Sequence, residues 1–361
     1  MRKLILPVLS IALLASCGDK DKDENEQVAE GYTVPSTYNF ENVSYSGQTD
    51  RLNMLKELTA HIKTGHSENT TLDADVLNAM YANEAHTWSS DAFPNGQPTK
   101  DLKSKTYEDA QKDIVSLFDS IAKYSGKAGG EDGQAGLVTG TGRTILVDAN
   151  GMEYAQLIDK GLMGSCFYYQ ATSKYLSDDK IGDAVDNTTV EAGKGTPKEH
   201  HFDEGFGYFG AAIDFPTNTE GVSFWAKYSN KVDEVAGTNI IMDSFLEGRA
   251  AISNKDKSAQ NDAVAEIKKQ WEKISAATAI HYLNDAIDAD DTADKLHVLT
   301  EAYAFIKALK YNVDASIDGD KVEEVLAALG DNFWNTTPTK IEEARNILAA
   351  AAGLESEKGN L

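Results

Sequence analysis

Cysteine is almost absent from this sequence of 361 residues, which contains only Cys17 and Cys166. If Cys17 carries a lipid, as we predict below from the residues around it, no intramolecular disulfide can form. We expect Cys166, within GLMGSCFYY, to be a small buried residue. The chain must therefore take its stability from an apolar core, and an apolar content of 41% suffices for one large domain or two smaller ones.

Basic residues are also scarce. The 34 lysines and arginines are outnumbered by 58 aspartates and glutamates, and the formal net charge is −24 at pH 7. A surplus of this size repels nucleic acid and anionic membrane surfaces, so the sequence predicts no nucleic-acid partner. The charge is compatible with cation binding, but acidity alone does not establish such a site.

The apolar run at the N-terminus is short. It covers residues 4–14, whereas a membrane-spanning helix needs about 20 apolar residues. The run follows Arg2 and Lys3 and ends in LASC, where a small residue precedes Cys17. The basic start, apolar core and final cysteine together predict a lipoprotein signal peptide over residues 1–16 and lipidation of Cys17. The alternative is an ordinary secreted protein with a cysteine near its cleavage site.

The residues that follow offer little to bury. Residues 18–30, GDKDKDENEQVAE, hold Val28 as their only large apolar side chain, which predicts disorder. We assign residues 17–45 to a lipidated and mostly disordered tether. Its run DKDKDE resembles the acidic export tags of Bacteroidota surface lipoproteins, although lysines interrupt it, and a solvated spacer is the alternative. We therefore predict an outer-membrane lipoprotein of a Gram-negative envelope, on the periplasmic face or the cell surface, that contacts the membrane only through its lipid.

Helical periodicity fills most of the remaining chain. We find no alternating strand pattern of useful length, and the glycine-rich stretch 125–144 is predicted to be irregular. The sequence predicts an all-α multi-helix bundle over residues 46–352, with candidate halves 46–195 and 196–352, and a C-terminal tail, 353–361. The predicted helices span residues 51–63, 72–84, 107–125, 149–176, 196–214, 241–252, 257–288, 291–311, 319–329 and 338–352.

The helix start at Thr196 has a clear sequence signature. Thr196 suits the N-cap, Pro197 suits the first turn, and Glu199 completes a capping box. At about 100° per residue, His201 and Glu204 then fall on one line whose other members include small residues, beside a stripe of phenylalanines. We expect this pair to point into the bundle, where ionisable groups need partners or a metal.

The same design recurs near the C-terminus. His297 and Glu301 lie one turn apart, and Ala304 and Ala308 share their line. Small residues on both lines allow helices to approach each other closely. We therefore predict that the two His–Glu pairs converge in one pocket between helices.

Two further residues are outer candidates for this site. His281 has Asp285 one turn on, and Glu153 shares a helical line with Gln156 and Lys160. The line through Glu153 has an alternative interpretation as a solvated face.

Helical bundles build metal sites from carboxylates and histidines that project inward from facing helices. Imidazole suits zinc, iron, copper and nickel, whereas carboxylates suit harder ions. We therefore predict a divalent or iron ion bound by His201, Glu204, His297 and Glu301. The main alternative is a buried hydrogen-bond network that fixes helix register.

Three sequence blocks resemble those of a Bacteroidota lipoprotein family that is named only as a domain of unknown function. The blocks are NGMEYAQLIDKGLMG, HHFDEGFGYFG and HVLTEAYAFIKALKYN, and the resemblance spans about residues 35–350. That family is distantly similar to the imelysin-like proteins, which are linked to iron acquisition and marked by Gly-x-His-x-x-Glu. His201 and Glu204 match this motif, but Glu199 stands where its glycine belongs. The resemblance implies a two-part helical fold, an envelope location and a role in iron or metal uptake.

We therefore predict a non-enzymatic, monomeric, lipid-anchored binding protein that acts in iron or other metal acquisition with envelope uptake partners. One alternative is a zinc-type metallohydrolase that uses the same side chains, with Glu204 as general base. The other is a scaffold or adhesion lipoprotein without a small-molecule site. An open coordination position beside an acid favours the hydrolase, and a closed network favours the scaffold.

Overall fold

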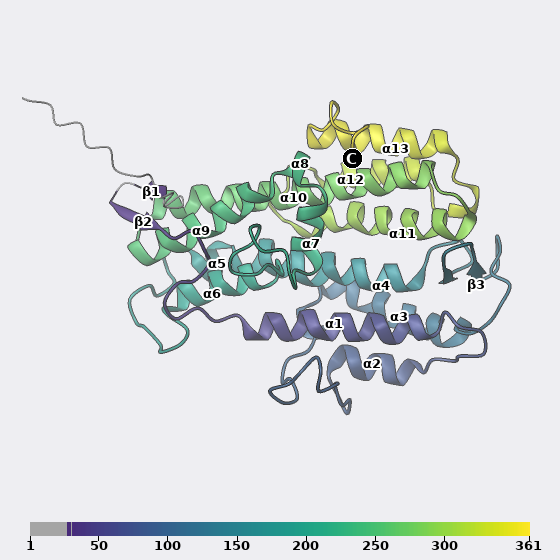
Figure 1. Cartoon of the computed structure of the whole chain (residues 1–361), viewed down its shortest axis with the longest axis horizontal. Coiled ribbons are helices and arrows are strands. Elements are labelled where there is room, and N and C mark those ends of the chain that lie inside the picture. Colours follow the sequence, from purple (N-terminus) through teal and green to yellow (C-terminus); the bar gives the residue numbers. More distant parts are fainter. Residues whose placement is uncertain (1–26, 30) are drawn as a thin grey trace, which may run out of the picture.

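Helices form most of the structure, a computed structural model that describes residues 27–29 and 31–361 (Figure 1). The predicted signal peptide and Cys17 lie outside the described residues. The predicted all-α class is confirmed. The helices are α1 (Ser46–Thr64), α2 (Ala74–Ala82), α3 (Glu108–Tyr124), α4 (Tyr154–Leu162), α5 (Asp178–Ile181), α6 (Pro197–Gly207), α7 (Phe224–Lys231), α8 (Asp233–Ala236), α9 (Thr238–Asn254), α10 (Lys257–Ile287), α11 (Thr292–Ala308), α12 (Gly319–Leu329) and α13 (Pro338–Ala352), with 3-10 turns η1 (Lys103–Lys105), η4 (Leu309–Tyr311) and η5 (Phe333–Asn335).

The long helices lie side by side. In Figure 1 they run from α2 and α1 at one edge through α4 and α11 to α12 and α13 at the other, and neighbours in this series pack on each other. The longest helix, α10, has 31 residues and packs on α9, α11 and α13. At 1.5 Å per residue it spans about 46 Å. Among the described residues, no helix combines the length and apolarity that a membrane crossing requires.

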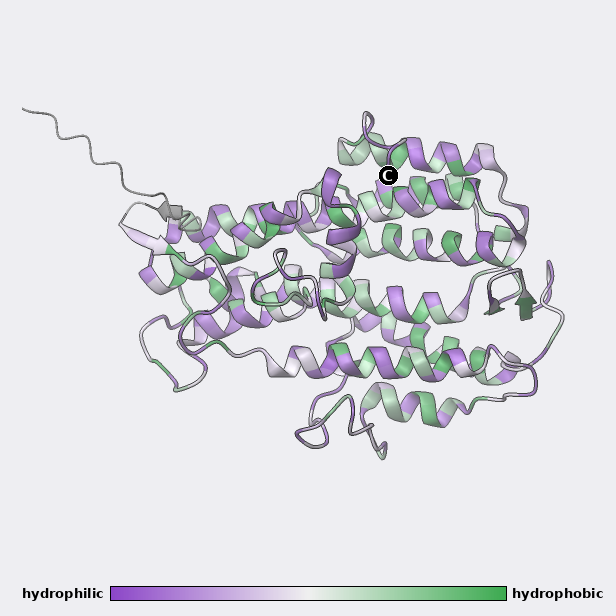
Figure 2. Ribbon diagram, viewed as in Figure 1, coloured by the Kyte–Doolittle hydropathy of each residue, from purple (hydrophilic) through white to green (hydrophobic). Residues whose placement is uncertain are grey.

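One hydrophobic core joins the two predicted halves. Apolar residues on the facing sides of the helices form a single cluster with members from both halves (Figure 2). The ring of Tyr168 lies 5.4 Å from Trp225, and Trp225 lies 5.6 Å from Phe305. The boundary at residue 196 therefore crosses a continuous core.

The structure also contains two small sheets that the sequence analysis does not predict. Strand β1 (Gln27–Ala29) pairs antiparallel with β2 (Tyr32–Val34), and β3 (Gly136–Thr139) pairs antiparallel with β4 (Thr144–Val147). The second hairpin begins inside the stretch expected to be irregular. Its strands have only four residues each and are largely buried, so no alternation of apolar and polar residues marks them.

The predicted helix at 149–176 changes its geometry midway. After α4, π-helical turns follow over η2 (Met163–Tyr168) and η3 (Gln170–Tyr175). Gly164 lets α11 approach this segment closely, because a Cβ atom there would lie 2.8 Å from Cβ of Ala308. Ala308 belongs to the small-residue face of His297, so a close approach along that face is present, but the segment that approaches is the one after α4 and not α6.

Both ends of the described chain pack on the bundle. Tyr38, within the predicted tether, is 1% exposed, and its ring stacks on Phe206 with centroids 3.7 Å apart. In the predicted tail, Leu354 is buried and the carbonyl oxygen of Leu361 accepts a hydrogen bond from Asn284. The folded body therefore includes residues that the sequence analysis assigns to the tether and the tail.

Helix α6 begins where its capping signature predicts. Oγ1 of Thr196 accepts from the backbone N–H of Glu199 at 3.2 Å, and the Glu199 carboxylate accepts from the backbone N–H of Thr196 at 2.8 Å. However, the helix ends at Gly207 rather than near residue 214. Residues 208–214 are therefore not part of the helix and do not lie on the helical faces that the sequence predicts for them.

Replacing Thr196 with alanine should lower the free energy of unfolding by about 1 kcal/mol, because an orphan N–H of the first turn loses its acceptor. Urea denaturation measures this change. Thr337→Ala is a matched control, since Thr337 caps α13 through a longer bond of 3.4 Å and should contribute less. A Thr196→Ala variant as stable as wild type would contradict the expected role of the cap.

Candidate functional site

The His297–Glu301 pair lies in a buried group of ionisable side chains. Nδ1 of His297, on α11, lies 2.5 Å from Oε2 of Glu153, the residue just before α4. Its other ring nitrogen, Nε2, lies 3.5 Å from Oε2 of Glu301. A carboxylate accepts hydrogen bonds, so we place a proton on Nδ1 of His297. In the neutral imidazole, Nε2 then keeps a lone pair that faces Glu301.

Lys160 and Asp159 extend this group into the bundle. Nζ of Lys160 lies 2.5 Å from Oδ2 of Asp159 and 3.4 Å from Oε1 of Glu301. Burial alone would lower the pKa of Lys160, but Asp159, Tyr228 and Glu301 together raise that pKa well above its ordinary value. Lys160 is therefore a buried cation held by carboxylates. We use the name central network for Glu153, Asp159, Lys160, His297 and Glu301.

The helical face that carries Glu153, Gln156 and Lys160 is buried and not solvated. Glu153 is 1% exposed, Gln156 2% and Lys160 8%. The contact between Glu153 and His297 therefore joins an outer candidate to a predicted site residue. It does so because α11 packs directly on α4.

His66, which no sequence pattern marks as a candidate, lies near this group. It follows the C-terminus of α1, and burial lowers its pKa while the charge of Glu153 acts in the opposite direction. Its Nε2 is buried without a hydrogen-bond partner among the described residues. A lone histidine in the turn TGHSEN carries no spacing signal that could have identified it.

The His201–Glu204 pair has different neighbours. Nδ1 of His201 donates to the backbone carbonyl of Lys180 at 2.7 Å, and burial lowers the pKa of His201. Glu204 accepts a hydrogen bond from Gln48 of α1 at 3.0 Å, and its other oxygen lies 4.0 Å from Nε2 of His200. These contacts come from α1, α5 and α6 itself.

Within the described part of the chain, no hydrogen bond or ion pair joins the two His–Glu pairs. The sequence predicts Glu204 on the inward face of α6, but the buried acid of this helix is Asp203, which is 0% exposed. The described residues also contain no group of three or more His, Cys, Asp or Glu side chains positioned to hold a metal ion. The structure thus has two clusters where the sequence predicts one shared site.

Asp203 belongs to a buried ion network of its own. Its Oδ1 accepts from Nε of Arg249 at 2.8 Å and from the hydroxyl of Tyr38 at 2.9 Å. Nη1 of Arg249 also donates to Glu199 at 2.8 Å. Burial raises the pKa of Asp203 to about 6, although Arg249 opposes this shift. The network links α6, α9 and the N-terminal segment, and we use the name Arg249 network for these four side chains.

The remaining outer candidate, His281, pairs with its own helix. Its Nε2 lies 3.2 Å from Oδ2 of Asp285, one turn along α10. Burial is the main cause that lowers the pKa of His281. This contact is local, and it leaves His281 outside the central network as defined above.

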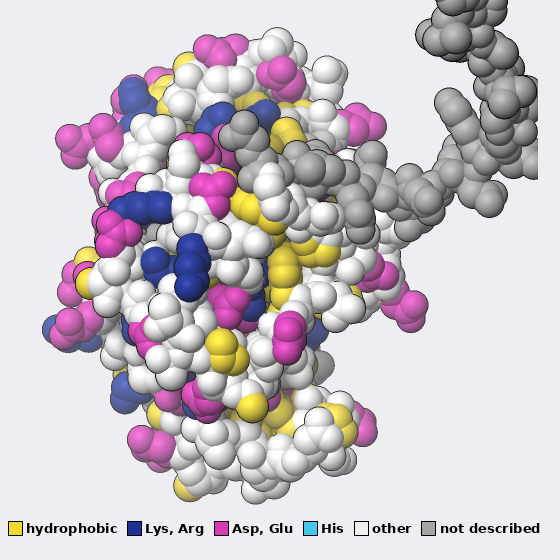
Figure 3. Space-filling view, turned by 90° about the vertical axis from the view of Figure 1, so that its left-hand side faces the viewer, with side chains coloured by type: hydrophobic (Ala, Val, Ile, Leu, Met, Phe, Trp, Pro, Cys, Tyr) yellow, Lys and Arg dark blue, Asp and Glu magenta, His cyan; other side chains and the backbone are white. Residues whose placement is uncertain are grey.

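Two hollows lie away from these clusters. A groove of about 730 Å³ runs between α10, α5 and residues 312–316, and a hollow of about 450 Å³ adjoins it at Gln260. Figure 3 shows acidic and basic side chains mixed over this end of the molecule. Charges of both signs line the two hollows, and some of them pair, Lys268 with Asp314 and Lys257 with Asp183. These hollows therefore carry no concentrated charge of one sign.

Comparison with known proteins adds a family but no described relative. No curated protein and no solved structure matches the chain. A family model described as a domain of unknown function, DUF4856, matches residues 35–355, which include every element from α1 to α13. The chain therefore belongs to the DUF4856 family.

Proposed function

We propose that this protein is a lipid-anchored, non-enzymatic binding protein of the cell envelope that binds a metal ion or metal compound at His297 and Glu301. The observation that supports the proposal is the contact series from Glu153 through His297 to Glu301. Glu153 holds Nδ1, and carboxylates in this position orient the imidazole ligands of metal proteins. The second ring nitrogen is directed at a carboxylate that can share the same ion.

The spacing of the two donors suits this role. Two ligands about 2.0–2.1 Å from one tetrahedral ion are roughly 3.4 Å apart. Nε2 of His297 and Oε2 of Glu301 are 3.5 Å apart, which is too long for a good hydrogen bond. Among the described residues, only these two donors meet here, so water or a chelating compound would supply the other ligands. That arrangement fits an exchangeable cargo better than a structural metal.

Lys160 limits the affinity that such a site can reach. Its ammonium group already neutralises part of the Glu301 charge, so a metal ion competes with it for the carboxylate. The same contact supports a second candidate function, a scaffold or adhesion lipoprotein in which the central network only holds α4 against α11. The hydrolase alternative gains no support, because Glu204, its proposed base, is bonded to Gln48 in the other cluster.

The envelope location and the iron connection are parts of the same proposal. The location rests on the signal-peptide features of residues 1–16 and on Cys17. The iron connection rests on the distant resemblance to imelysin-like proteins, whose motif falls on His201 and Glu204 rather than on the central network.

Replacing His297 with alanine should weaken metal binding at least about tenfold, since half of the protein ligand set is lost. Isothermal titration of untagged protein with Zn²⁺ and Ni²⁺ measures the affinity, and elemental analysis measures the metal carried through purification. Glu153→Gln should weaken binding by about 10–100-fold through loss of ring orientation.

His201→Ala is the matched control and should leave the affinity unchanged, because His201 bonds to Lys180 instead. Equal losses from His201→Ala and His297→Ala would instead support the single shared site predicted from the sequence. If wild type binds no metal and His297→Ala only reduces stability, by about 1–3 kcal/mol, the central network is a structural contact and the metal-binding proposal is wrong.

A further inference from the structure

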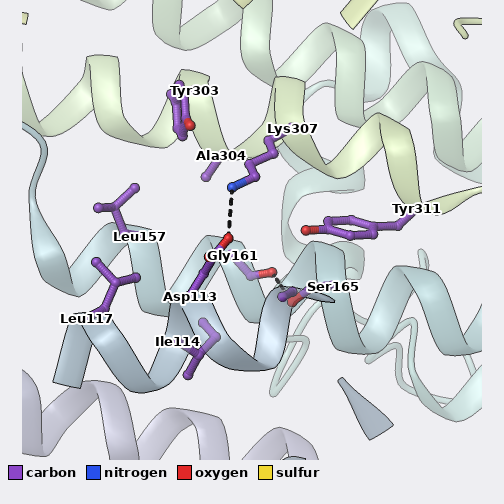
Figure 4. A pocket seen from close by; sticks show the side chains of 11 residues that line it. Asp113, Ile114, Leu117, Leu157, Gly161, Ser165, Tyr303, Ala304, Lys307 and Tyr311 are labelled. Atoms are coloured by element: carbon purple, nitrogen blue, oxygen red, sulfur yellow. Dashed lines mark hydrogen bonds and ion pairs between the residues drawn. The ribbon is translucent and has the colours of Figure 1, made fainter. Parts of the chain in front are cut away.

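A separate small cavity lies between α3, α4 and α11. Its volume is about 60 Å³, and no member of the central network lines it. In Figure 4, Leu157 and Gly161 of α4 form the floor, with α3 on one side and α11 on the other. Gly161 leaves space here, since a Cβ atom at this position would meet nothing within 4 Å.

The walls combine aliphatic and aromatic surface. Ile114 and Leu117 of α3 line one side, and the rings of Tyr303 and Tyr311 line the other (Figure 4). Burial is the main cause that raises the pKa of Tyr303, and the charge of Asp113 adds to it. Asp113 therefore places a negative charge at a cavity whose walls are mostly aliphatic and aromatic.

An ammonium group already occupies this environment. Nζ of Lys307 lies 3.8 Å from Oδ2 of Asp113 and 6.0 Å from the centroid of the Tyr303 ring. Both charged side chains are well exposed, at 69% for Asp113 and 39% for Lys307. An ion pair of this length and exposure contributes little stability, so a competing cation can displace the lysine.

We propose that this cavity binds a small organic ammonium ion, and that Lys307 places its own ammonium there in the free protein. The ligand's charged group would take the position between Asp113 and Tyr303 that Lys307 leaves. Its apolar part would pack on Leu117 and Leu157 above Gly161. Carboxylate and aromatic ring together are the groups that recognise organic cations.

The volume limits the size of the ligand. A closed apolar cavity of about 150 Å³ accommodates benzene, so 60 Å³ holds about two or three carbon atoms of the ligand, and its ammonium end lies in the space that Lys307 leaves. A short alkylammonium ion such as n-butylammonium has this size. An anion of the same shape would instead approach Asp113 and should be excluded.

The experiment is a titration of the purified protein with n-butylammonium, followed by protein NMR chemical shifts, with butyrate as the anionic probe of equal size. We expect saturable shifts with n-butylammonium and none with butyrate. Lys307→Met should bind the amine about threefold tighter or better, because the internal competitor is gone. Asp113→Asn should bind it about two- to fivefold more weakly, because an exposed counter-charge is gone.

Two further variants make the test specific. Lys310→Met removes an equal charge from a lysine that pairs with Glu323 and does not line the cavity, so its affinity should match wild type. Gly161→Leu fills the floor and should abolish saturation, with circular dichroism confirming that the helices persist. The proposal is overturned if butyrate binds as well as the amine, if no variant shows saturable shifts, or if Lys307→Met binds no tighter than wild type.

Discussion

Replacing Arg249 with methionine should lower the free energy of unfolding by about 3–5 kcal/mol, which is the usual loss when one partner of a buried ion pair is removed. Arg249 and Asp203 are both about fully buried, at 1% and 0% side-chain exposure. Without the guanidinium, the Asp203 carboxylate remains in the core with the Tyr38 hydroxyl and a backbone N–H as its remaining donors. Chemical denaturation of the two proteins measures the difference.

Acidification should reduce this loss. The pKa of Asp203 in the folded protein is already raised to about 6, so the folded state gains a proton as the pH falls through that value. Uptake of a proton by the folded state stabilises it relative to the unfolded chain, whose carboxyl titrates near 3.8. Loss of Arg249 raises the pKa of Asp203 further, so the variant should recover stability between pH 7 and pH 5.

Arg143→Met is the matched control for this experiment. Arg143 pairs with Asp294 at 2.6 Å, but the two side chains are 39% and 27% exposed, so the change should cost at most about 1 kcal/mol. Adding Asp203→Asn to Arg249→Met removes the stranded charge and should restore part of the lost stability. Equal losses from Arg249→Met and Arg143→Met would contradict the role assigned to the buried pair.

Helix positions were predictable where local signals are strong. The capping box at Thr196 set the first residue of α6 correctly, and the predicted helices 319–329 and 338–352 coincide with α12 and α13. The π-helical turns after α4 and the hairpin of β3 and β4 were not predictable in the same way. At the π-helical turns Gly164 packs closely on Ala308, and the period of apolar residues carries no signal for such a contact.

The candidate site was predictable as pairs of residues but not as an assembly. Periodicity places His297 and Glu301 on one face of a helix, and the structure confirms that they are neighbours. Periodicity does not indicate which other helix packs on the face of α11 that carries His297 and Glu301. Lys160 was therefore predictable only as a neighbour of Glu153 on one helical face, and not as a partner of Glu301. The wrong inward face at α6 has a physical cause. The predicted helix continues to residue 214, whereas α6 ends at Gly207, so residues that are not helical contributed to the face on which Glu204 was placed.

The sequence around Arg249 does contain a signal for its buried position. It stands in EGRAAIS, between Gly248 and Ala250, on a helix whose inward positions are otherwise apolar or small. A single arginine among small residues can reach a buried acid on a neighbouring helix because nothing beside it blocks the approach. Gly248 shows this closeness directly, since a Cβ atom there would lie 2.6 Å from the ring of Phe202.

Replacing Lys160 with methionine should lower the free energy of unfolding by about 3–5 kcal/mol at pH 7, because Asp159 and Glu301 are left charged and buried without their cation. The pKa of Lys160 in the folded protein lies above its ordinary value of 10.5. The wild-type contribution is therefore complete below that pH and is lost only as the pH rises through the folded pKa. Lys268→Met is the matched control, since its partner Asp314 is 61% exposed and is rehydrated easily.

The same variant separates the two candidate functions of the central network. If His297 and Glu301 bind a metal, Lys160→Met removes the ammonium that competes for Glu301 and should tighten Zn²⁺ binding. Because a ligand bound only by the folded state stabilises it, Zn²⁺ should then restore part of the stability lost by the variant. If the network is only a structural contact between α4 and α11, Zn²⁺ should leave the denaturation midpoint of Lys160→Met unchanged. The prediction fails if Zn²⁺ stabilises wild type and not Lys160→Met, since the lysine would then assist the metal rather than oppose it.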